Sequence, residues 1–301
     1  MVKRYMDCQA SDLANLSKED KLKSLYLSEG RVLVTEVVGS FPPILGDVSN
    51  AELACAMGSD IILFNAFDVN DNIIFGIDSD KPLKKAKELT NRLIGVNLEP
   101  VFEIDENDDS LWRLSAGRTA TMDNIQKLID QDVDFLVLTG NPGTGVTNQG
   151  ILDVIKQVKE KFGDKIAIIS GKMHAAGSST EANENLISEK TVKDFIEAGT
   201  DIVLIPAPGT IPGFDLKKVK KLIKVIHEYG KMSMTAVGTS QEGSDLETVK
   251  NIALMCKMSG TDIHHLGDSG LSPGIASPEN ITAYSTVIKG KRHTFRRMAK
   301  R

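Results

Sequence analysis

The chain has 301 residues, of which 41% are hydrophobic, 26% charged and 5% aromatic, and its formal net charge is -5. This length exceeds that of a typical small domain and suits an α/β barrel, which needs roughly 250 residues. The negative charge and the scarcity of aromatic residues argue against a nucleic-acid partner. No segment has the roughly 18 consecutive apolar residues of a membrane span, so we expect no membrane partner and a cytoplasmic location.

The N-terminal segment is predicted to be a short helical extension. Ser17 is a plausible N-cap because charged residues of a first helical turn, Lys18-Glu19-Asp20, follow it. We therefore expect two parts, an N-terminal helical extension (residues 1–30) and a barrel (residues 31–301). In barrels such an extension often covers the bottom of the barrel or forms an oligomer contact.

A weak internal repeat predicts four of the strands. In each copy a helix end and a turn precede an Asp and an apolar run, which suits a strand covered on both faces. The four Asp residues are Asp60, Asp134, Asp201 and Asp262. Four further strands are expected between these copies, at residues 32–38, 96–102, 165–170 and 231–237.

The spacing of these eight strands predicts a single (β/α)8 TIM barrel. Successive strands begin roughly 30 residues apart, the length of one strand and its crossover helix. Eight such units indicate a closed barrel rather than an open sheet. The lack of a GxGxxG motif after the first strand also argues against a dinucleotide-binding fold.

Lys172 and His174 are the first candidates for catalysis. The active site of such a barrel forms at the C-terminal ends of the strands, and both residues follow the fifth predicted strand. Lys172 could form a Schiff base if it were neutral, or could anchor an anionic substrate; we favour the charged role because acidic residues follow neighbouring strands. His174 could be an acid, a base or a metal ligand.

The loops after the seventh and eighth strands predict a phosphate site. Glycine-rich turns there can direct backbone N–H groups towards an anion, and hydroxyl groups add further donors. Asp268 lies in the same region and would repel an anion. The candidate phosphate-binding residues are Gly238, Thr239, Ser240, Gly267, Ser269 and Gly270.

Acidic residues near the ends of the first three strands are candidates for catalysis or for metal binding. Glu36, Asp68 and Glu99 could hold Mg²⁺ or Mn²⁺, which favour oxygen ligands. The alternative is that loop N–H groups satisfy these carboxylates. His264 and His265 are adjacent, so at most one of them faces the barrel interior. Asp268 shares the parity of His264, and this favours His264 as the catalytic one.

The C-terminal segment, residues 289–301, is strongly basic. A nucleic-acid contact is one interpretation of such a block. Because the rest of the chain is acidic, we expect a solvated helix end or a subunit contact instead.

Two family resemblances bear on function. The segments around Gly39-Ser40-Phe41-Pro42 and Asn65-Ala66-Phe67-Asp68 resemble BtpA-like barrels. The chain as a whole is similar to an uncharacterised group of bacterial barrels often encoded near sugar phosphotransferase genes. The segments that carry this similarity are residues 238–243, 264–268 and 290–294. The resemblance implies a TIM barrel and a phosphorylated sugar as ligand, and it assigns no catalytic residue.

Two functional hypotheses follow. The first is an enzyme that acts on a phosphorylated sugar or sugar acid, of the lyase, aldolase, isomerase or epimerase type, with Lys172, His174, Glu36, Asp68 and His264 as catalytic candidates. The second is a non-catalytic barrel of BtpA-like type that binds a metabolite or a partner. In both cases we expect a small phosphorylated metabolite as ligand and a homo-oligomer.

Overall fold

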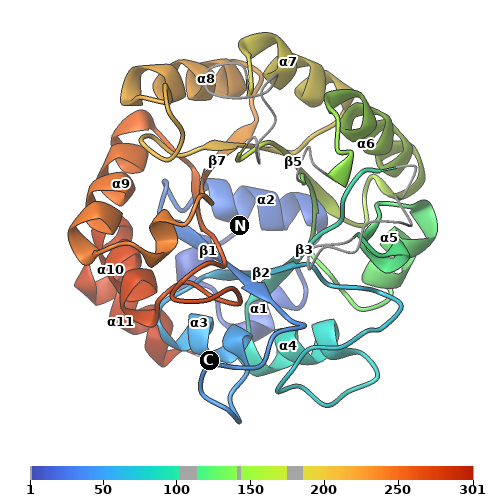
Figure 1. The fold of residues 1–301 in the computed structure, drawn as a ribbon, viewed down its shortest axis with the longest axis vertical. Helices are drawn as coiled ribbons and strands as arrows, with labels where there is room; N and C mark the ends of the chain where they lie inside the picture. The colour runs from blue at the N-terminus through green and yellow to red at the C-terminus, as the bar shows by residue number, and fades with distance from the viewer. Residues whose placement is uncertain (1, 102–113, 141–143, 175–185, 301) are drawn as a thin grey trace.

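A closed parallel barrel forms the centre of the molecule, with helices around it (Figure 1). The structure is a computed structural model that describes residues 2–101, 114–140, 144–174 and 186–300. The strand order runs β1 to β8 and β8 pairs with β1, which confirms the predicted (β/α)8 barrel. The strands are β1 (Val32–Val38), β2 (Ile61–Asn65), β3 (Leu93–Asn97), β4 (Phe135–Leu138), β5 (Ala167–Gly171), β6 (Ile202–Pro206), β7 (Met232–Val237) and β8 (Ile263–Leu266).

The helices form an outer ring and close one end of the barrel. Within the described parts of the chain, no helix combines the length and apolar character needed to cross a bilayer. The helices are α1 (Ala10–Leu13), α2 (Lys18–Tyr26), α3 (Asn50–Ala56), α4 (Pro82–Thr90), α5 (Met122–Ile129), α6 (Asn148–Phe162), α7 (Glu189–Ala198), α8 (Leu216–Glu228), α9 (Leu246–Ser259), α10 (Pro278–Lys289) and α11 (Lys291–Ala299).

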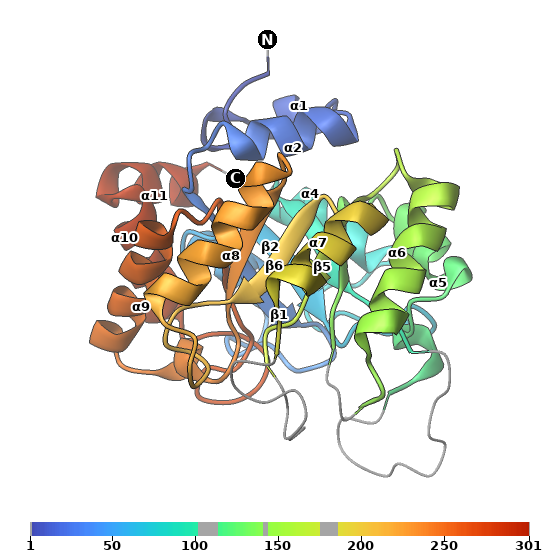
Figure 2. The same ribbon diagram turned by 90° about the horizontal axis from the view of Figure 1, so that it is seen from above.

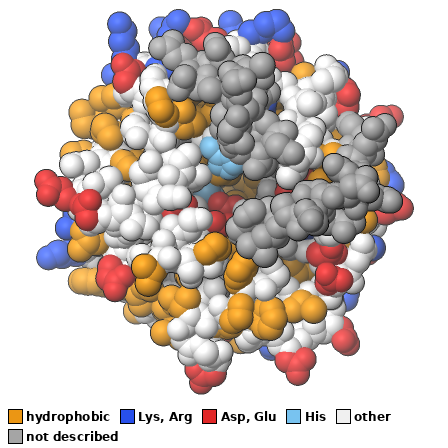
Figure 3. Space-filling model, viewed as in Figure 1, with side chains coloured by type: hydrophobic (Ala, Val, Ile, Leu, Met, Phe, Trp, Pro, Cys, Tyr) orange, Lys and Arg blue, Asp and Glu red, His pale blue; other side chains and the backbone are white. Residues whose placement is uncertain are grey.

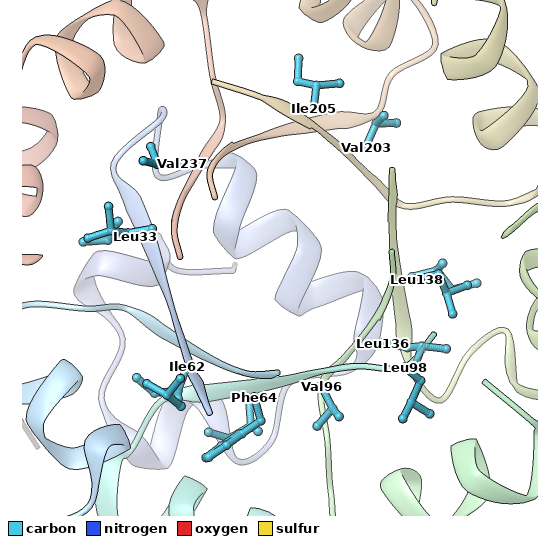
Figure 4. Packing of buried hydrophobic residues seen from close by; sticks show 14 of the residues in the cluster. Leu33, Ile62, Phe64, Val96, Leu98, Leu136, Leu138, Val203, Ile205 and Val237 are labelled. Carbon is cyan, nitrogen blue, oxygen red and sulfur yellow. The ribbon is translucent and has the colours of Figure 1, made fainter. Parts of the chain in front are cut away.

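Each strand has apolar side chains on both faces, because the helices cover one face and the barrel interior covers the other. One set of side chains points outward to the helices, and Figure 4 shows Leu33, Ile62 and Val203 in this position. The alternate set, which includes Val34 and Ile61, fills the barrel interior. This arrangement explains why near-continuous apolar runs, rather than alternating ones, mark the strands.

The third strand differs from the predicted range 96–102. β3 begins directly after Asn91, which ends α4 in the left-handed conformation with φ of 50°. It ends at Asn97, and Glu99 N–H then donates to Arg118 O at 2.9 Å instead of to a strand of the barrel. The apolar residues Leu98 and Val101 made the segment resemble a longer strand, although they lie in the loop that follows β3.

The four repeated Asp residues have a common structural role. Each one stands just before an even-numbered strand and accepts a hydrogen bond from a backbone N–H near the start of the strand before it. The four donors are Leu33, Ile94, Ile168 and Ser233, at 2.8, 2.9, 3.0 and 2.8 Å from Asp60, Asp134, Asp201 and Asp262 respectively. The repeat therefore marks the N-terminal end of the barrel, away from the predicted active site.

The N-terminal extension covers this same end of the barrel, as Figure 2 shows for α1 and α2. Tyr5 and Leu25 pack in the same apolar cluster as the barrel interior. Two lysines of α2 pair with the repeated carboxylates. Lys18 Nζ lies 2.8 Å from Asp201, and Lys21 Nζ lies 2.6 Å from Asp134. The extension thus closes the bottom of the barrel, one of the two positions that the sequence suggested.

The basic C-terminal segment is not simply a solvated helix end. Arg297 of α11 is 2% exposed, and its Nε donates to Asp60 at 2.9 Å. Lys289 of α10 pairs with the other oxygen of the same carboxylate. Arg92 Nη2 donates to Arg297 O at 2.7 Å. The prediction of a solvated helix end is therefore wrong for Lys289 and Arg297, which are buried, while Phe295 of the same segment is exposed.

Candidate active site

A polar pocket opens at the C-terminal ends of the strands. Its volume is about 260 Å³, which is at the small end for ligand sites. Figure 3 shows acidic and histidine side chains together in the central hollow of this face. The described lining residues are Glu36, Asn65, Ala66, Asn97, Glu99, Arg118, Thr139, Gly140, Thr144, Met173, His174, Gly238, Ser240, Glu242, Asp268 and Ser269.

Glu36 and His265 form a buried pair at the pocket. Glu36 lies on β1 and His265 on β8, and the two side chains approach each other because both face inward from adjacent strands. His265 Nε2 lies 3.0 Å from Glu36 Oε2. Burial raises the pKa of Glu36, the negative charge of Asp268 raises it further, and contact with His265 opposes both effects.

Glu242 is the second titratable group of the pocket. It lies in a short 3-10 turn after β7 and is 2% exposed. Burial, together with the charges of Asp268 and Glu36, raises its pKa to about 7. Its Oε1 accepts a hydrogen bond from Ser269 N–H at 3.3 Å, while Oε2 has no partner among the described residues. A carboxyl group with this pKa can both accept and donate a proton near neutral pH.

Asp268 stands beside Glu242 in the loop after β8. Asn65 Nδ2 donates to its Oδ2 at 3.0 Å, and Ser269 Oγ donates to its Oδ1 at 3.1 Å. The amide of Asn65 also contacts that of Asn97 at 3.1 Å. These contacts fix the carboxylate of Asp268 at the edge of the pocket.

The opposite wall carries an ion pair and a neutral histidine. Arg118 Nη2 lies 2.6 Å from Glu99 Oε1, and Thr144 donates to Glu99 Oε2 at 2.6 Å. His174 follows β5, and burial lowers its pKa below 6.5, so the imidazole is neutral at pH 7. It lines the pocket, at the end of the strand where the sequence predicted it.

Lys172 lies near the pocket but is not among its described lining residues. It is 1% exposed. Lys172 follows the last residue of β5, Gly171, and Met173 packs in the apolar cluster of the barrel interior. The roles predicted for Lys172, as an anchor for an anionic substrate or as a Schiff base, stay predictions.

The preference for His264 over His265 is corrected. His264 points outward to the helical layer, where its Nδ1 lies 3.1 Å from the hydroxyl of Tyr284 and its Nε2 lies 3.1 Å from Gly30 O. Sequence parity between His264 and Asp268 misled the prediction because β8 ends at Leu266, and parity does not continue through the loop.

The proposed metal set does not converge. Glu36 and Glu99 line the pocket, whereas Asp68 accepts hydrogen bonds from the N–H groups of Asn70 and Asp71 at 2.7 and 3.2 Å and from Ser115. Asp68 thus matches the alternative of a carboxylate satisfied by its own loop. In the described part of the chain, no three His, Cys, Asp or Glu side chains are placed to hold a metal ion.

The two glycine-rich loops share the pocket, and three of the backbone donors in the loop after β8 are occupied. Gly267 N–H donates to Val237 O at 2.8 Å, and Gly270 N–H donates to Ile275 O at 3.1 Å. Ser269 N–H is used by Glu242. Of the six candidate phosphate residues, the pocket lining includes Gly238, Ser240 and Ser269, and it does not include Thr239, Gly267 and Gly270.

An anion at these loops would also meet two carboxylates. The Cβ of a larger residue at position 267 would stand 2.6 Å from Glu242 Oε1, so the space beside Gly267 is taken by Glu242. The glycine therefore makes room for a carboxylate, and phosphate binding at these loops stays a prediction.

Several pocket residues were not singled out from the sequence. Arg118 follows a segment with no clear strand pattern in the sequence. A hydrogen bond from Glu99 N–H to Arg118 O holds its backbone next to the end of β3. Glu242 had a usable signal, since it lies in the loop after the seventh predicted strand. His265 was considered and set aside in favour of its neighbour.

The chain belongs to the family described as "Domain of unknown function (DUF7916)", whose model matches residues 6–301. The predicted membership of an uncharacterised barrel family is thus confirmed at that level, while the BtpA-like resemblance and the link to sugar phosphotransferase genes stay predictions. The comparison with curated proteins found no match.

Solved structures of several enzymes have similar folds. Thiamine phosphate pyrophosphorylase from Pyrococcus furiosus is 10% identical with a TM-score of 0.50, and the match covers 87% of this chain and 98% of that one. A 2,3-dimethylmalate lyase of the PEP mutase/isocitrate lyase superfamily is 10% identical with a TM-score of 0.51, over 83% and 81% of the two chains. Pyruvate carboxylase from Rhizobium etli is 13% identical with a TM-score of 0.53, over 95% of this chain and 29% of that one. At these identities the similarity establishes the fold alone.

Proposed function

We propose that this protein is an enzyme that acts by proton transfer on a small hydroxylated metabolite of the sugar or sugar-acid class, as a lyase, aldolase, isomerase or epimerase. The observation that carries the proposal is Glu242, a buried carboxyl group in the pocket with a pKa of about 7. Perturbed groups of this kind, placed in a cleft at the C-terminal face of a barrel, are typical of acid–base catalysts.

Glu242 is the proposed acid or base. Ser269 N–H holds its Oε1 in place, and the carboxyl group lines the pocket in which the substrate proton would be exchanged. Abstraction of a proton next to a carbonyl group needs a donor that polarises the carbonyl oxygen. The neutral imidazole of His174 is the candidate for this role, because it lines the same pocket.

The pocket lining favours a hydroxylated substrate. Asn97, Thr139 and Ser240 offer amide and hydroxyl groups that can exchange hydrogen bonds with several substrate hydroxyls. Arg118 is the candidate anchor for a carboxylate, although it is already paired with Glu99. A phosphorylated form of the substrate stays a prediction.

Hydrogen–deuterium exchange tests the proposal without knowledge of the natural product. A panel of aldoses, ketoses, amino sugars, sugar acids and their phosphates is incubated with the protein in D₂O, and NMR follows exchange at the carbon next to the carbonyl group. We expect exchange with at least one member and a loss of about 100-fold or more in Glu242→Gln.

Glu247→Gln is the matched control, because Glu247 is an exposed glutamate of α9. It should leave the exchange rate unchanged. Exchange that persists at the wild-type rate in Glu242→Gln contradicts the assigned role. No exchange with any member favours the non-catalytic metabolite-binding barrel.

A further inference from the structure

The distribution of charge in the pocket indicates which class of substrate it binds. This inference rests on the proposed function. Four carboxyl groups belong to the described lining of the pocket, and two of them have basic partners: Glu99 pairs with Arg118 and Glu36 contacts His265. The other two, Glu242 and Asp268, form no ion pair with a described residue. The remaining basic residue of the described lining, His174, is neutral at pH 7.

The orphaned oxygen of Glu242 points to a missing partner. Glu242 is 2% exposed, and its Oε2 has no hydrogen-bond partner among the described residues. A buried polar atom without a partner costs free energy, so such an atom at a pocket wall marks a place where a ligand donates. The charge of Asp268 acts on Glu242, and Asp268 only accepts hydrogen bonds, so a donor that carries positive charge would satisfy both carboxyl groups.

We propose that the substrate carries an ammonium group that binds between Glu242 and Asp268, and that the pocket thus takes an amino sugar or a similar hydroxylated amine. An ammonium group offers three donors and compensates the two unpaired carboxyl groups. The hydroxyl and amide groups of the lining, such as Thr139 and Ser240, bind the hydroxyls of the same molecule.

A metal ion fits this arrangement less well than an ammonium group. Mg²⁺ and Mn²⁺ need several oxygen ligands converging at about 2 Å on one point. Within the described residues no three acidic, His or Cys side chains converge in this way. The donors of an ammonium group diverge and reach acceptors that stand further apart.

Binding measurements with matched ligands test the proposal. Isothermal titration calorimetry compares glucosamine, galactosamine and mannosamine with glucose, galactose and mannose, which carry a hydroxyl in place of the amine. We expect at least one amine to bind about tenfold or more tightly than its neutral counterpart. Glu242→Gln and Asp268→Asn should each remove most of that preference, while Glu247→Gln should keep it.

Three results would overturn the proposal. They are equal binding of amine and neutral sugar, an amine preference that survives in both pocket variants, and no binding of any amine. A titration with MgCl₂ or MnCl₂ alone tests the alternative of a metal site. Saturable metal binding that is lost in Glu242→Gln would show that the two carboxyl groups bind a metal ion, and it would overturn the proposal. The deuterium exchange assay on neutral sugars is independent of these outcomes, so the proposed proton transfer can stand while the amine assignment fails.

Discussion

At the scale of single residues, the glycines of the late loops provide room for Glu242. A Cβ at position 267 would stand 2.6 Å from Glu242 Oε1 and 2.8 Å from Val237 O, and the latter is backbone that cannot easily move. The same glycine that suggested a phosphate cradle in the sequence therefore sets the position of the proposed base.

We predict that Gly267→Ala lowers the exchange rate by about tenfold or more, because misplacement of a catalytic group by a fraction of an ångström is costly. The measurement is the D₂O exchange assay with the best member of the panel, and the urea midpoint is recorded in parallel. An alanine variant with wild-type exchange and wild-type stability would show that the close approach is not maintained in solution.

The histidine pair shows why residue-level predictions depend on register. His264 and His265 have the same chemistry in the sequence, and the pairing of β8 with β1 and β7 decides which one faces inward. Candidates on strands or directly after them, such as Glu36 and His174, were predictable from the rule that the site follows the strand ends. The same rule covers Glu242 in the loop after the seventh predicted strand, whereas Arg118 was harder to predict because the segment before it has no periodic pattern.

At the scale of elements, the repeated Asp joins each odd strand to the strand after it. The turn and Asp positions predicted the even strands because each has a role: a residue of positive φ ends the helix, glycine in three copies and Asp132 in the fourth, and the Asp accepts from the backbone N–H of the neighbouring strand. The partners of these carboxylates could not be predicted, since Asp60 and Arg297 are 237 positions apart. Long-range pairing of this kind leaves no local pattern.

We predict that Asp60→Ala lowers the free energy of unfolding by about 3–5 kcal/mol, because it leaves the buried cations Lys289 and Arg297 without their counter-charge. Asp262→Ala is the matched comparison. Its partner His227 is half exposed, so the loss should be clearly smaller. Urea unfolding at pH 7 measures both, and equal losses would refute the special role of the buried cations.

At the scale of the whole molecule, the expected homo-oligomer needs a face that excludes water. Leu246, Leu254 and Met258 of α9 are 44%, 49% and 58% exposed and lie on one stripe of the helix. Contiguous exposed apolar residues are typical of subunit contacts.

We predict that light scattering gives the mass of an oligomer for the wild-type protein. The double variant Leu254→Lys, Met258→Lys should have the mass of a monomer. A monomeric mass for the wild-type protein at high concentration would contradict this expectation.

The dependence of stability on pH is also a property of the whole fold, and His264 determines part of it. Burial lowers its pKa from 6.5 to about 3, because the ring lies between Tyr284 and Gly30 with no access to water. As the pH falls below 6.5, the unfolded chain binds a proton that the folded protein excludes, so stability falls progressively until about pH 3.

His227 affects the pH dependence of stability in the opposite direction. Its hydrogen bond to Asp262 raises its pKa, so its contribution to stability is complete below pH 6.5 and is lost as the pH rises through the raised value. Urea unfolding at pH 7.5, 6.0 and 4.5 should show a decrease towards acid that is smaller in His264→Asn than in the wild type, whereas His227→Gln should retain it. An acid decrease of equal size in His264→Asn would assign it to other groups.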